Sequence, residues 1–184
     1  KEMGFSGREA PFFFMKPADA VLPVPFGKTG ELPYPGETAN LHHEIELVVA
    51  IGRAGRNIAP AAAPSHIWGY AVGLDMTRRD LQFALRDKGR PWDVAKGFDF
   101  SAPISPLKPI ALTGELTSAA IWLEVNGQKR QSSDVAKLIW NVNETIAHLS
   151  KYFTLVPGDL IYTGTPEGVG AVSPGDVLVG GIAG

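Results

Sequence analysis

The most regular hydrophobic pattern in the chain lies in residues 45–51 (IELVVAI), where isoleucine, leucine and valine occupy every second position. A period of two predicts a β-strand with one face in a core. Glu44 and Glu46 then share the opposite face, about 7 Å apart at a rise of about 3.3 Å per residue. The strand therefore ends in a pair of carboxylates at the rim of a buried sheet.

Two neighbouring carboxylates at such a rim repel each other and are costly to remove from water. A bound cation would compensate for both effects. The alternative is a solvent-facing strand whose glutamates form ordinary salt bridges. An isolated Glu-x-Glu pattern is compatible with either interpretation, and the choice depends on the rest of the chain.

A second apolar run, residues 67–74 (IWGYAVGL), predicts another buried strand, which ends at Asp75. Thr77 stands three residues before Asp80, which is the spacing of a helix start. The helix expected after Thr77 ends before the Gly89–Pro91 region and turns an apolar stripe inward, formed by Leu81, Ala84 and Leu85. Asp75 is thus expected at the exit of a buried strand, a position that suits active-site groups and turn aspartates alike.

Shorter signals complete the outline of the fold. The aromatic run of residues 12–14 predicts a buried strand that ends at Lys16. The Asn126–Gly127 pair between two apolar runs predicts a hairpin with a type I′ turn. Asn141, with Glu144 three residues later, predicts the start of a helix whose Ile146, Leu149 and Phe153 face inward. Together these elements predict a mostly β domain with a few short helices, of the α+β class.

Composition narrows the functional classes. The 17 lysines and arginines nearly balance 19 aspartates and glutamates without forming a basic stripe, which disfavours nucleic acid or an anionic membrane as a partner. No run approaches 18 apolar residues, and no signal peptide is visible. The absence of cysteine excludes disulfides, thiolate metal sites and cysteine nucleophiles, and fits a cytoplasmic protein.

Two further segments carry candidate chemistry with open alternatives. Lys96 lies in a loop of bulky and small residues, 91–99, where a lysine either extends to solvent or pairs with an anion. Residues 162–170 (YTGTPEGVG) form a Gly- and Thr-rich loop after a strand, which suits carboxylate binding but is also typical of a structural turn. The loop lacks the Gly-Lys-Ser/Thr ending of a phosphate-binding Walker loop.

The order of these segments is more specific than any one of them. Residues 41–46 (LHHEIE), 74–77 (LDMT), 91–96 (PWDVAK) and 163–170 (TGTPEGVG) together resemble the fumarylacetoacetate hydrolase family over almost the whole chain. The similarity is greatest to its single-domain acylpyruvate and fumarylpyruvate hydrolases.

The resemblance implies a mixed β-sandwich roll, a single catalytic domain over residues 1–184 that lacks its extreme N-terminal segment, and a homodimer. It also implies a Mg²⁺ or Mn²⁺ ion held by Glu44, Glu46 and Asp75. Three carboxylates make an all-oxygen site, which favours Mg²⁺, Mn²⁺ or Ca²⁺ over zinc or copper.

The resemblance also assigns roles around the substrate. Lys96 matches a lysine that lies beside the substrate, while Arg79, Gln82 and Thr165 match substrate-contacting positions. The family activates water with a His-x-x-Glu pair near the N-terminus. Glu2 matches that glutamate, and the histidine would stand one residue before Lys1.

These roles imply hydrolysis of a 2,4-dioxo acid such as fumarylpyruvate, in the breakdown of aromatic compounds. Water attacks the distal carbonyl with Glu2 as general base, and the C–C bond breaks to release the enolate of pyruvate, whose charge a metal ion and Lys96 stabilise. Thr165 would hold the carboxylate, and Arg79 or Gln82 the acyl end.

Three alternatives remain at this stage. Oxaloacetate decarboxylation passes through the same enolate, and isomerisation of a dienoic acid is closely related chemistry. The histidine absent before Lys1 also allows a non-catalytic, metal-dependent binder of 2-oxo acids.

Overall fold

The computed structural model describes residues 8–183, and its largest element is a mixed sheet built around β3 (Ile45–Ile51) and β4 (Ile67–Leu74). These strands pair antiparallel over their whole length. β10 (Leu160–Tyr162) borders β3, and β6 (Ala102–Ile104) and β7 (Lys108–Pro109) pair with β4. β1 (Val21–Pro23) closes the far edge in parallel with β6. The alternation seen in residues 45–51 thus marks a central strand of the fold.

Two three-stranded sheets accompany the large one within the described residues. β8 (Ala120–Val125) and β9 (Gln128–Asp134) form the predicted hairpin, with β12 (Leu178–Ile182) on the other side of β8. Asn126 and Gly127 both have positive φ, as a type I′ turn requires. β2 (Leu41–His43) lies between β11 (Gly170–Val172) and β5 (Thr77–Arg78) in the other small sheet. This sheet connects the segments on either side of the carboxylates.

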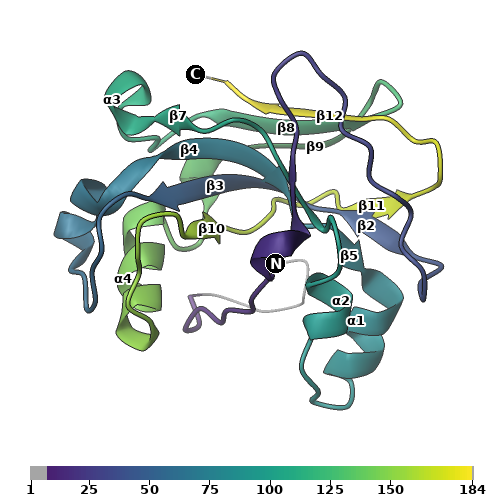
Figure 1. The fold of residues 1–184 in the computed structure, drawn as a ribbon, viewed down its shortest axis with the longest axis horizontal. Helices are drawn as coiled ribbons and strands as arrows, with labels where there is room; N and C mark the ends of the chain where they lie inside the picture. The colour runs from purple at the N-terminus through teal and green to yellow at the C-terminus, as the bar shows by residue number, and fades with distance from the viewer. Residues whose placement is uncertain (1–7, 184) are drawn as a thin grey trace.

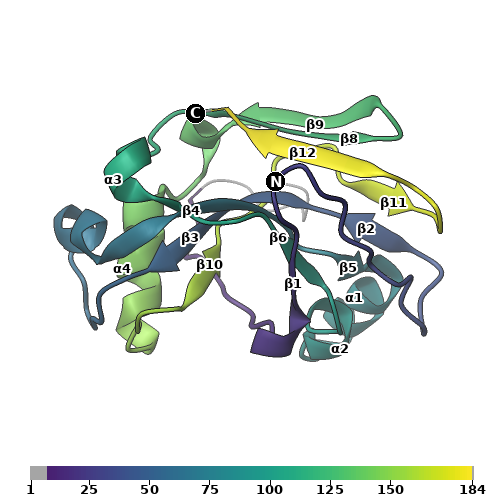
Figure 2. The same ribbon diagram turned by 45° about the horizontal axis from the view of Figure 1, so that its top comes forward.

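The β8–β9–β12 sheet lies over the large sheet, as both ribbon views show (Figures 1 and 2). The apolar face of β3 packs in one buried cluster with Ile121 and Leu123 of β8 and with Ile146 of α4 (Val142–Tyr152). α4 begins with the predicted capping box of Asn141 and Glu144. The main core therefore covers one face of β3 and leaves the other face for the carboxylates.

The remaining helices are short. α1 (Arg79–Arg86) and α2 (Asp93–Lys96) lie together beside β5, at the end of the molecule opposite α4 (Figure 1). α3 (Ile110–Thr113) and the 3₁₀ turns at Ala18–Ala20, Pro60–His66 and Val135–Lys137 complete the fold. No helix of the described part has the length and apolar character needed to cross a bilayer.

Two predictions of local structure are wrong. Residues 12–16 form no strand, and the side chains of Phe12 and Phe14 are largely exposed, because they pack on the ring of Trp92 at the surface. Phe153, expected to face the core, is 41% exposed at the end of α4.

Thr77 does not cap α1 either, because it lies in β5, where its hydroxyl donates to the backbone carbonyl oxygen of Asp75 and accepts from Lys96. The predicted apolar stripe of α1 is also only partly buried: Leu81 and Leu85 are half-buried and Ala84 is exposed. The fully buried side chains of the helix are those of Arg79 and Gln82. Its inner face is polar because it borders the cluster described next.

Candidate active site: three buried carboxylates and their cations

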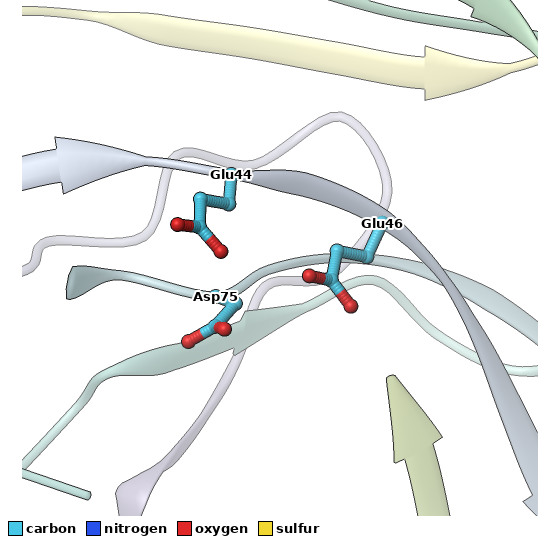
Figure 3. Close-up of side chains that lie close together, drawn as sticks. All are labelled: Glu44, Glu46 and Asp75. Carbon is cyan, nitrogen blue, oxygen red and sulfur yellow. The ribbon is translucent and has the colours of Figure 1, made fainter. Parts of the chain in front are cut away.

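Glu44 and Glu46 project from the same side of one strand, as their spacing predicts. Glu44 immediately precedes β3 and Glu46 is its second residue, and both side chains point toward Asp75 (Figure 3). Their relative exposures are only 7% and 4%. The solvated strand face considered from the sequence alone is therefore excluded.

The pairing of β3 with β4 brings Asp75 to the glutamates. Ile45 is paired with Leu74, so the residue that follows β4 falls beside the one that precedes β3. The backbone N–H of Asp75 donates to the carbonyl oxygen of Glu44 at 2.8 Å. One carboxylate oxygen from each of the three acids lies within 4.8 Å of the others. Asp75 thus joins Glu44 and Glu46, which lie 31 and 29 positions earlier in the chain, because of a single strand register.

Burial and mutual repulsion perturb all three acids. Burial raises the pKa of Glu46 well above its usual range, and the charges of Asp75 and Glu44 raise it further. Burial, followed by the charge of Asp75, also raises the pKa of Glu44. Burial acts on Asp75 in the same direction, but the ammonium groups of Lys16 and Lys96 outweigh it and lower its pKa.

Lys96, at the end of α2, pairs with the carboxylates and does not extend to solvent. Its Nζ donates to Glu44 Oε2 at 2.9 Å, to Asp75 Oδ2 at 2.7 Å and to Thr77 Oγ1 at 2.6 Å, so each ammonium hydrogen has an acceptor. Burial lowers the pKa of Lys96, but the charges of Asp75 and Glu44 outweigh burial and raise it. Lys96 is therefore a fully buried, permanently charged cation.

Lys16 is a second cation at the site, which the sequence did not reveal. Its Nζ lies 2.8 Å from Asp75 Oδ1 and donates to Ser101 Oγ at 3.0 Å and to the carbonyl oxygen of Lys96. In the sequence Lys16 ends an aromatic run before Pro17, and nothing in that pattern points to Asp75. Because its partners are 59 or more positions away, only the folded chain shows this role.

Arg79 and Gln82 lie on the buried face of α1, beside Glu44. Arg79 Nη2 donates to Glu44 Oε1 and Nη1 to Gln82 Oε1, each at 2.5 Å. His42 also approaches, with Nδ1 3.4 Å from Arg79 Nε. Burial, together with the positive charge of Arg79, lowers the pKa of His42 to about 4, so this imidazole is neutral near pH 7.

The loop of residues 163–170 borders the cluster on the side of Glu46. The N–H of Gly164 donates to Glu46 Oε2 at 2.8 Å. Thr165 lies next to it, and its hydroxyl donates to the carbonyl oxygen of Ile45 at 2.9 Å. The structure thus brings Arg79, Gln82, Lys96 and the Thr165 loop to the three acids. Glu2 lies outside the described residues.

The donor set fits a hard divalent cation. All three side chains offer carboxylate oxygens, the ligands that Mg²⁺ and Mn²⁺ prefer. Within residues 8–183 no lysine, arginine or histidine forms an ion pair with Glu46, although this side chain is buried. Asp75 Oδ1 is buried and accepts no hydrogen bond from the described residues, its ion pair with Lys16 apart. A cation among the acids would give Glu46 the charged partner that it lacks within the described residues, and it would add to the pairing of Asp75 with Lys16.

The chain is similar in sequence to a known protein family and to characterised proteins. A family model described as the C-terminal region of fumarylacetoacetate hydrolase matches residues 1–184. A fumarylpyruvate hydrolase from a Ralstonia species is 52% identical over 176 residues, which cover 96% of this chain and 89% of that protein. A mitochondrial oxaloacetate decarboxylase from Dictyostelium discoideum is 41% identical over 184 residues, covering 100% of this chain and 83% of that protein.

The fold is also similar to that of a solved fumarylpyruvate hydrolase. The crystal structure of fumarylpyruvate hydrolase from Pseudomonas aeruginosa, in complex with Mn²⁺ and pyruvate, superimposes with a TM-score of 0.96 at 59% identity. The match covers 98% of this chain and 78% of that one. The mixed β fold with few helices is therefore confirmed.

Proposed function

The chain belongs to the fumarylacetoacetate hydrolase family, and we propose that it hydrolyses the C–C bond of a 2,4-dioxo acid, fumarylpyruvate or a related acylpyruvate, to pyruvate and a carboxylic acid. The observation that carries the proposal is the buried set of Glu44, Glu46 and Asp75, with Lys96 among them. The identities of 52% and 59% to fumarylpyruvate hydrolases support this substrate.

In this proposal Glu44, Glu46 and Asp75 hold one Mg²⁺ or Mn²⁺ ion. The ion supplies a Lewis acid that polarises the 2-oxo group of the substrate. The Mn²⁺ and pyruvate bound in the Pseudomonas aeruginosa relative support both the metal and the class of ligand. Protein side chains provide only three ligands, which leaves room for a chelating 2-oxo acid.

Lys96 has the most direct electrostatic role. Cleavage of the C–C bond leaves negative charge on the pyruvate fragment, as an enolate. A permanently charged ammonium that is buried and already held by three acceptors needs no reorganisation when that charge develops. Lys96 would therefore bind the transition state more tightly than the substrate, which is the requirement for a faster chemical step.

The remaining roles follow the geometry around the acids. Arg79 offers a guanidinium group for the acyl end, which in fumarylpyruvate carries a second carboxylate, and Gln82 orients it through their hydrogen bond. Thr165 and the neighbouring backbone would hold the carboxylate of the pyruvate part. Glu2 would act as general base for the attacking water, assisted by a histidine one residue before Lys1.

Oxaloacetate decarboxylation is the second candidate, favoured by the 41% identity to the Dictyostelium discoideum decarboxylase. Both reactions form an enolate at the same position. Hydrolysis requires a positioned water, whereas decarboxylation proceeds best where water is excluded. A substrate that contains a 2,4-dioxo group therefore separates the two activities.

A substrate panel tests the proposal. Protein treated with EDTA is assayed with fumarylpyruvate, acetylpyruvate and oxaloacetate, with and without added Mg²⁺ or Mn²⁺. We expect loss of fumarylpyruvate absorbance and formation of pyruvate only with metal, at a higher kcat/KM than for oxaloacetate. Faster turnover of oxaloacetate would favour the decarboxylase. Tight binding of pyruvate without turnover of any substrate would indicate a non-catalytic binder.

Metal binding is expected to depend on pH in a defined direction. The pKa of Glu46 is raised in the folded protein. In the pH window between its pKa in the unfolded chain and its pKa in the folded, metal-free protein, the folded protein keeps a proton that the unfolded chain has released. The stability of the metal-free protein therefore falls as the pH rises through this window. Asp75, with a lowered pKa, titrates below the window. A cation binds only the deprotonated carboxylates. We therefore expect Mn²⁺ to raise the Tm more at about pH 7.5 than at about pH 5.5.

Differential scanning calorimetry with and without Mn²⁺ checks this expectation, and Glu46→Gln serves as its comparison. The variant should show a smaller Mn²⁺ effect with a weaker dependence on pH, and the remaining dependence comes from Glu44, whose pKa is also raised. An equal or greater Tm increase at the lower pH in the original protein would contradict the role given to Glu46.

The proposal extends to the setting of the reaction. We place it in the cytoplasm, which the absence of cysteine supports, and in the breakdown of aromatic compounds, which the similarity to fumarylpyruvate hydrolases supports. We also expect a homodimer, as in the family that the sequence resembles. Sedimentation at several protein concentrations measures the assembly state directly.

A further inference from the structure

Gln131 is a buried polar residue on an otherwise exposed stretch of β9. Its relative exposure is 1%, whereas Arg130 and Ser132 on either side are exposed. Its side chain points from the β8–β9 hairpin toward β3 and the loop of residues 163–170. A buried amide in such a position needs partners for all its polar groups.

The carboxamide of Gln131 has a full set of four hydrogen-bond partners. Its oxygen accepts from the backbone N–H of Ile45 and pairs with His43 Nδ1, both at 3.0 Å. Its nitrogen donates to Thr165 Oγ1 at 2.8 Å and to the carbonyl oxygen of Pro166 at 2.9 Å. The backbone N–H of Ile45 can only donate and the carbonyl of Pro166 can only accept, so the amide has one possible orientation.

This orientation fixes the hydroxyl of Thr165. Thr165 Oγ1 accepts from Gln131, so its own proton is directed to the carbonyl oxygen of Ile45, 2.9 Å away. The next residue back, Gly164, donates its N–H to Glu46 Oε2. Gln131 thus lies between β3 and the loop at the point where the loop contacts the carboxylate cluster.

The backbones of the loop and of β9 also pack closely against each other beside Gln131. A Cβ added to Gly168 would lie 2.2 Å from the carbonyl oxygen of Arg130, the residue before Gln131. Gly168 also has a φ of +95°. The far end of the loop is therefore pressed against the backbone of β9, while Gln131 holds the near end.

We propose that Gln131 is a positioning residue for the binding of 2-oxo acids: its amide sets the distance and orientation of the Thr165 loop relative to Glu46. The inference rests on the proposed function, because that function gives the loop its role in holding the substrate carboxylate. Gln131 contacts neither the three acids nor Lys96, and it acts through Thr165 and Pro166.

The test measures binding of pyruvate to the Mn²⁺-loaded full chain by calorimetry. Gln131→Met, similar in length but without hydrogen-bonding groups, is expected to weaken pyruvate binding about tenfold, because the Thr165 loop loses the hydrogen bonds that hold it in place before the ligand binds. Mn²⁺ affinity, measured separately, should change less than about threefold, because the metal ligands are untouched. Gln128→Met, at an exposed position of the same strand, is the matched control and should bind pyruvate normally. Normal pyruvate binding by Gln131→Met would overturn the proposal.

A double-mutant cycle separates this role from a general loss of stability. Thr165→Val removes the hydroxyl but keeps the shape of the side chain. If Gln131 acts through Thr165, the fold-loss of pyruvate affinity in the double variant should be smaller than the product of the fold-losses in the two single variants. Independent, multiplicative effects would overturn the proposal. If Gln131→Met does not fold, Gln131→Asn replaces it, and failure of both to fold would assign Gln131 to the core and overturn the proposal.

Amide hydrogen exchange distinguishes this inference from the proposed function. In the metal-free protein Gln131→Met should speed exchange in residues 163–167 relative to Gln128→Met, whether or not pyruvate binds. Failure of the unsubstituted, Mn²⁺-loaded protein to bind pyruvate would reject the proposed function alone. Unchanged exchange in the loop of Gln131→Met would reject the positioning role alone.

Discussion

Replacing Lys96 with methionine is expected to lower kcat on fumarylpyruvate by about 10²–10³-fold, the usual effect of removing one preorganised group that stabilises a developing oxyanion. KM should change far less, because the enolate charge exists only after the C–C bond begins to break. Steady-state kinetics in saturating Mn²⁺ measure both constants. Methionine preserves most of the volume of the buried side chain, so the variant tests charge more than packing.

The same substitution should also change the stability of the metal-free protein. Lys96 pairs with Glu44 and Asp75, and removing one member of a buried ion pair typically destabilises a protein by about 3–5 kcal/mol. Added Mn²⁺ should restore much of the Tm, because it supplies positive charge to the same acids. Lys88→Met, an exposed lysine after α1, is the control and should leave kcat and Tm unchanged. Unchanged kcat in Lys96→Met would show that Lys96 has been given the wrong role.

Asp75→Asn is expected to reduce Mn²⁺ affinity by more than the about 10–100-fold typical of residues that only support a ligand. Asp75 is the acid whose pKa is lowered, so it is the carboxylate most readily available as an anion. Its amide counterpart has nearly the same shape but no charge, and it would leave Lys16 and Lys96 without their shared partner. Hydrolysis should fall in proportion to the loss of bound metal.

Asp80→Asn is the matched control for this substitution. Asp80 accepts from Thr38 Oγ1 and the N–H of Ala39 at the start of α1, and it does not contact the carboxylate cluster. Isothermal titration with Mn²⁺ should give normal affinity for this variant. Equal losses in the two variants, or an Asp75→Asn protein that binds Mn²⁺ normally, would contradict the assignment of Asp75 as a ligand.

Local patterns predicted the parts of the fold that depend on neighbouring residues. The alternation in residues 45–51 identified the central strand, because one of its faces packs in a single apolar cluster. The Asn126–Gly127 turn and the Asn141 capping box were also predicted correctly, since each depends on residues within four positions. Such signals need no knowledge of distant segments.

The errors arose where distant segments decide the environment. Residues 12–14 are apolar, yet Phe12 and Phe14 lie at the surface, where they contact the ring of Trp92, about 80 positions away in the chain. α1 was assigned an apolar inner face from its leucines, but the face that it turns inward carries Arg79 and Gln82. A period of 3.6 residues identifies a helix and not the chemistry of its neighbour.

The carboxylate cluster shows the same limit. The sequence pattern predicted that Glu44 and Glu46 share one face of a strand. Only the register of β3 against β4 brings Asp75 to them. The family resemblance supplied that third acid and Lys96 before the geometry was known. Lys16, Thr77 and Gln131 were missed, because their roles depend on contacts with residues far away in the chain.

The most direct test of the account is the position of a bound metal. Crystals of the protein grown with Mn²⁺ and pyruvate would be measured at the manganese absorption edge, where anomalous scattering identifies the ion. We expect one strong peak within bonding distance of an oxygen from each of Glu44, Glu46 and Asp75, with pyruvate bound to the same ion and Lys96 beside it. A peak elsewhere, or a structure in which Glu44 and Asp75 keep their ion pairs and none of the three acids binds manganese, would contradict the central claim.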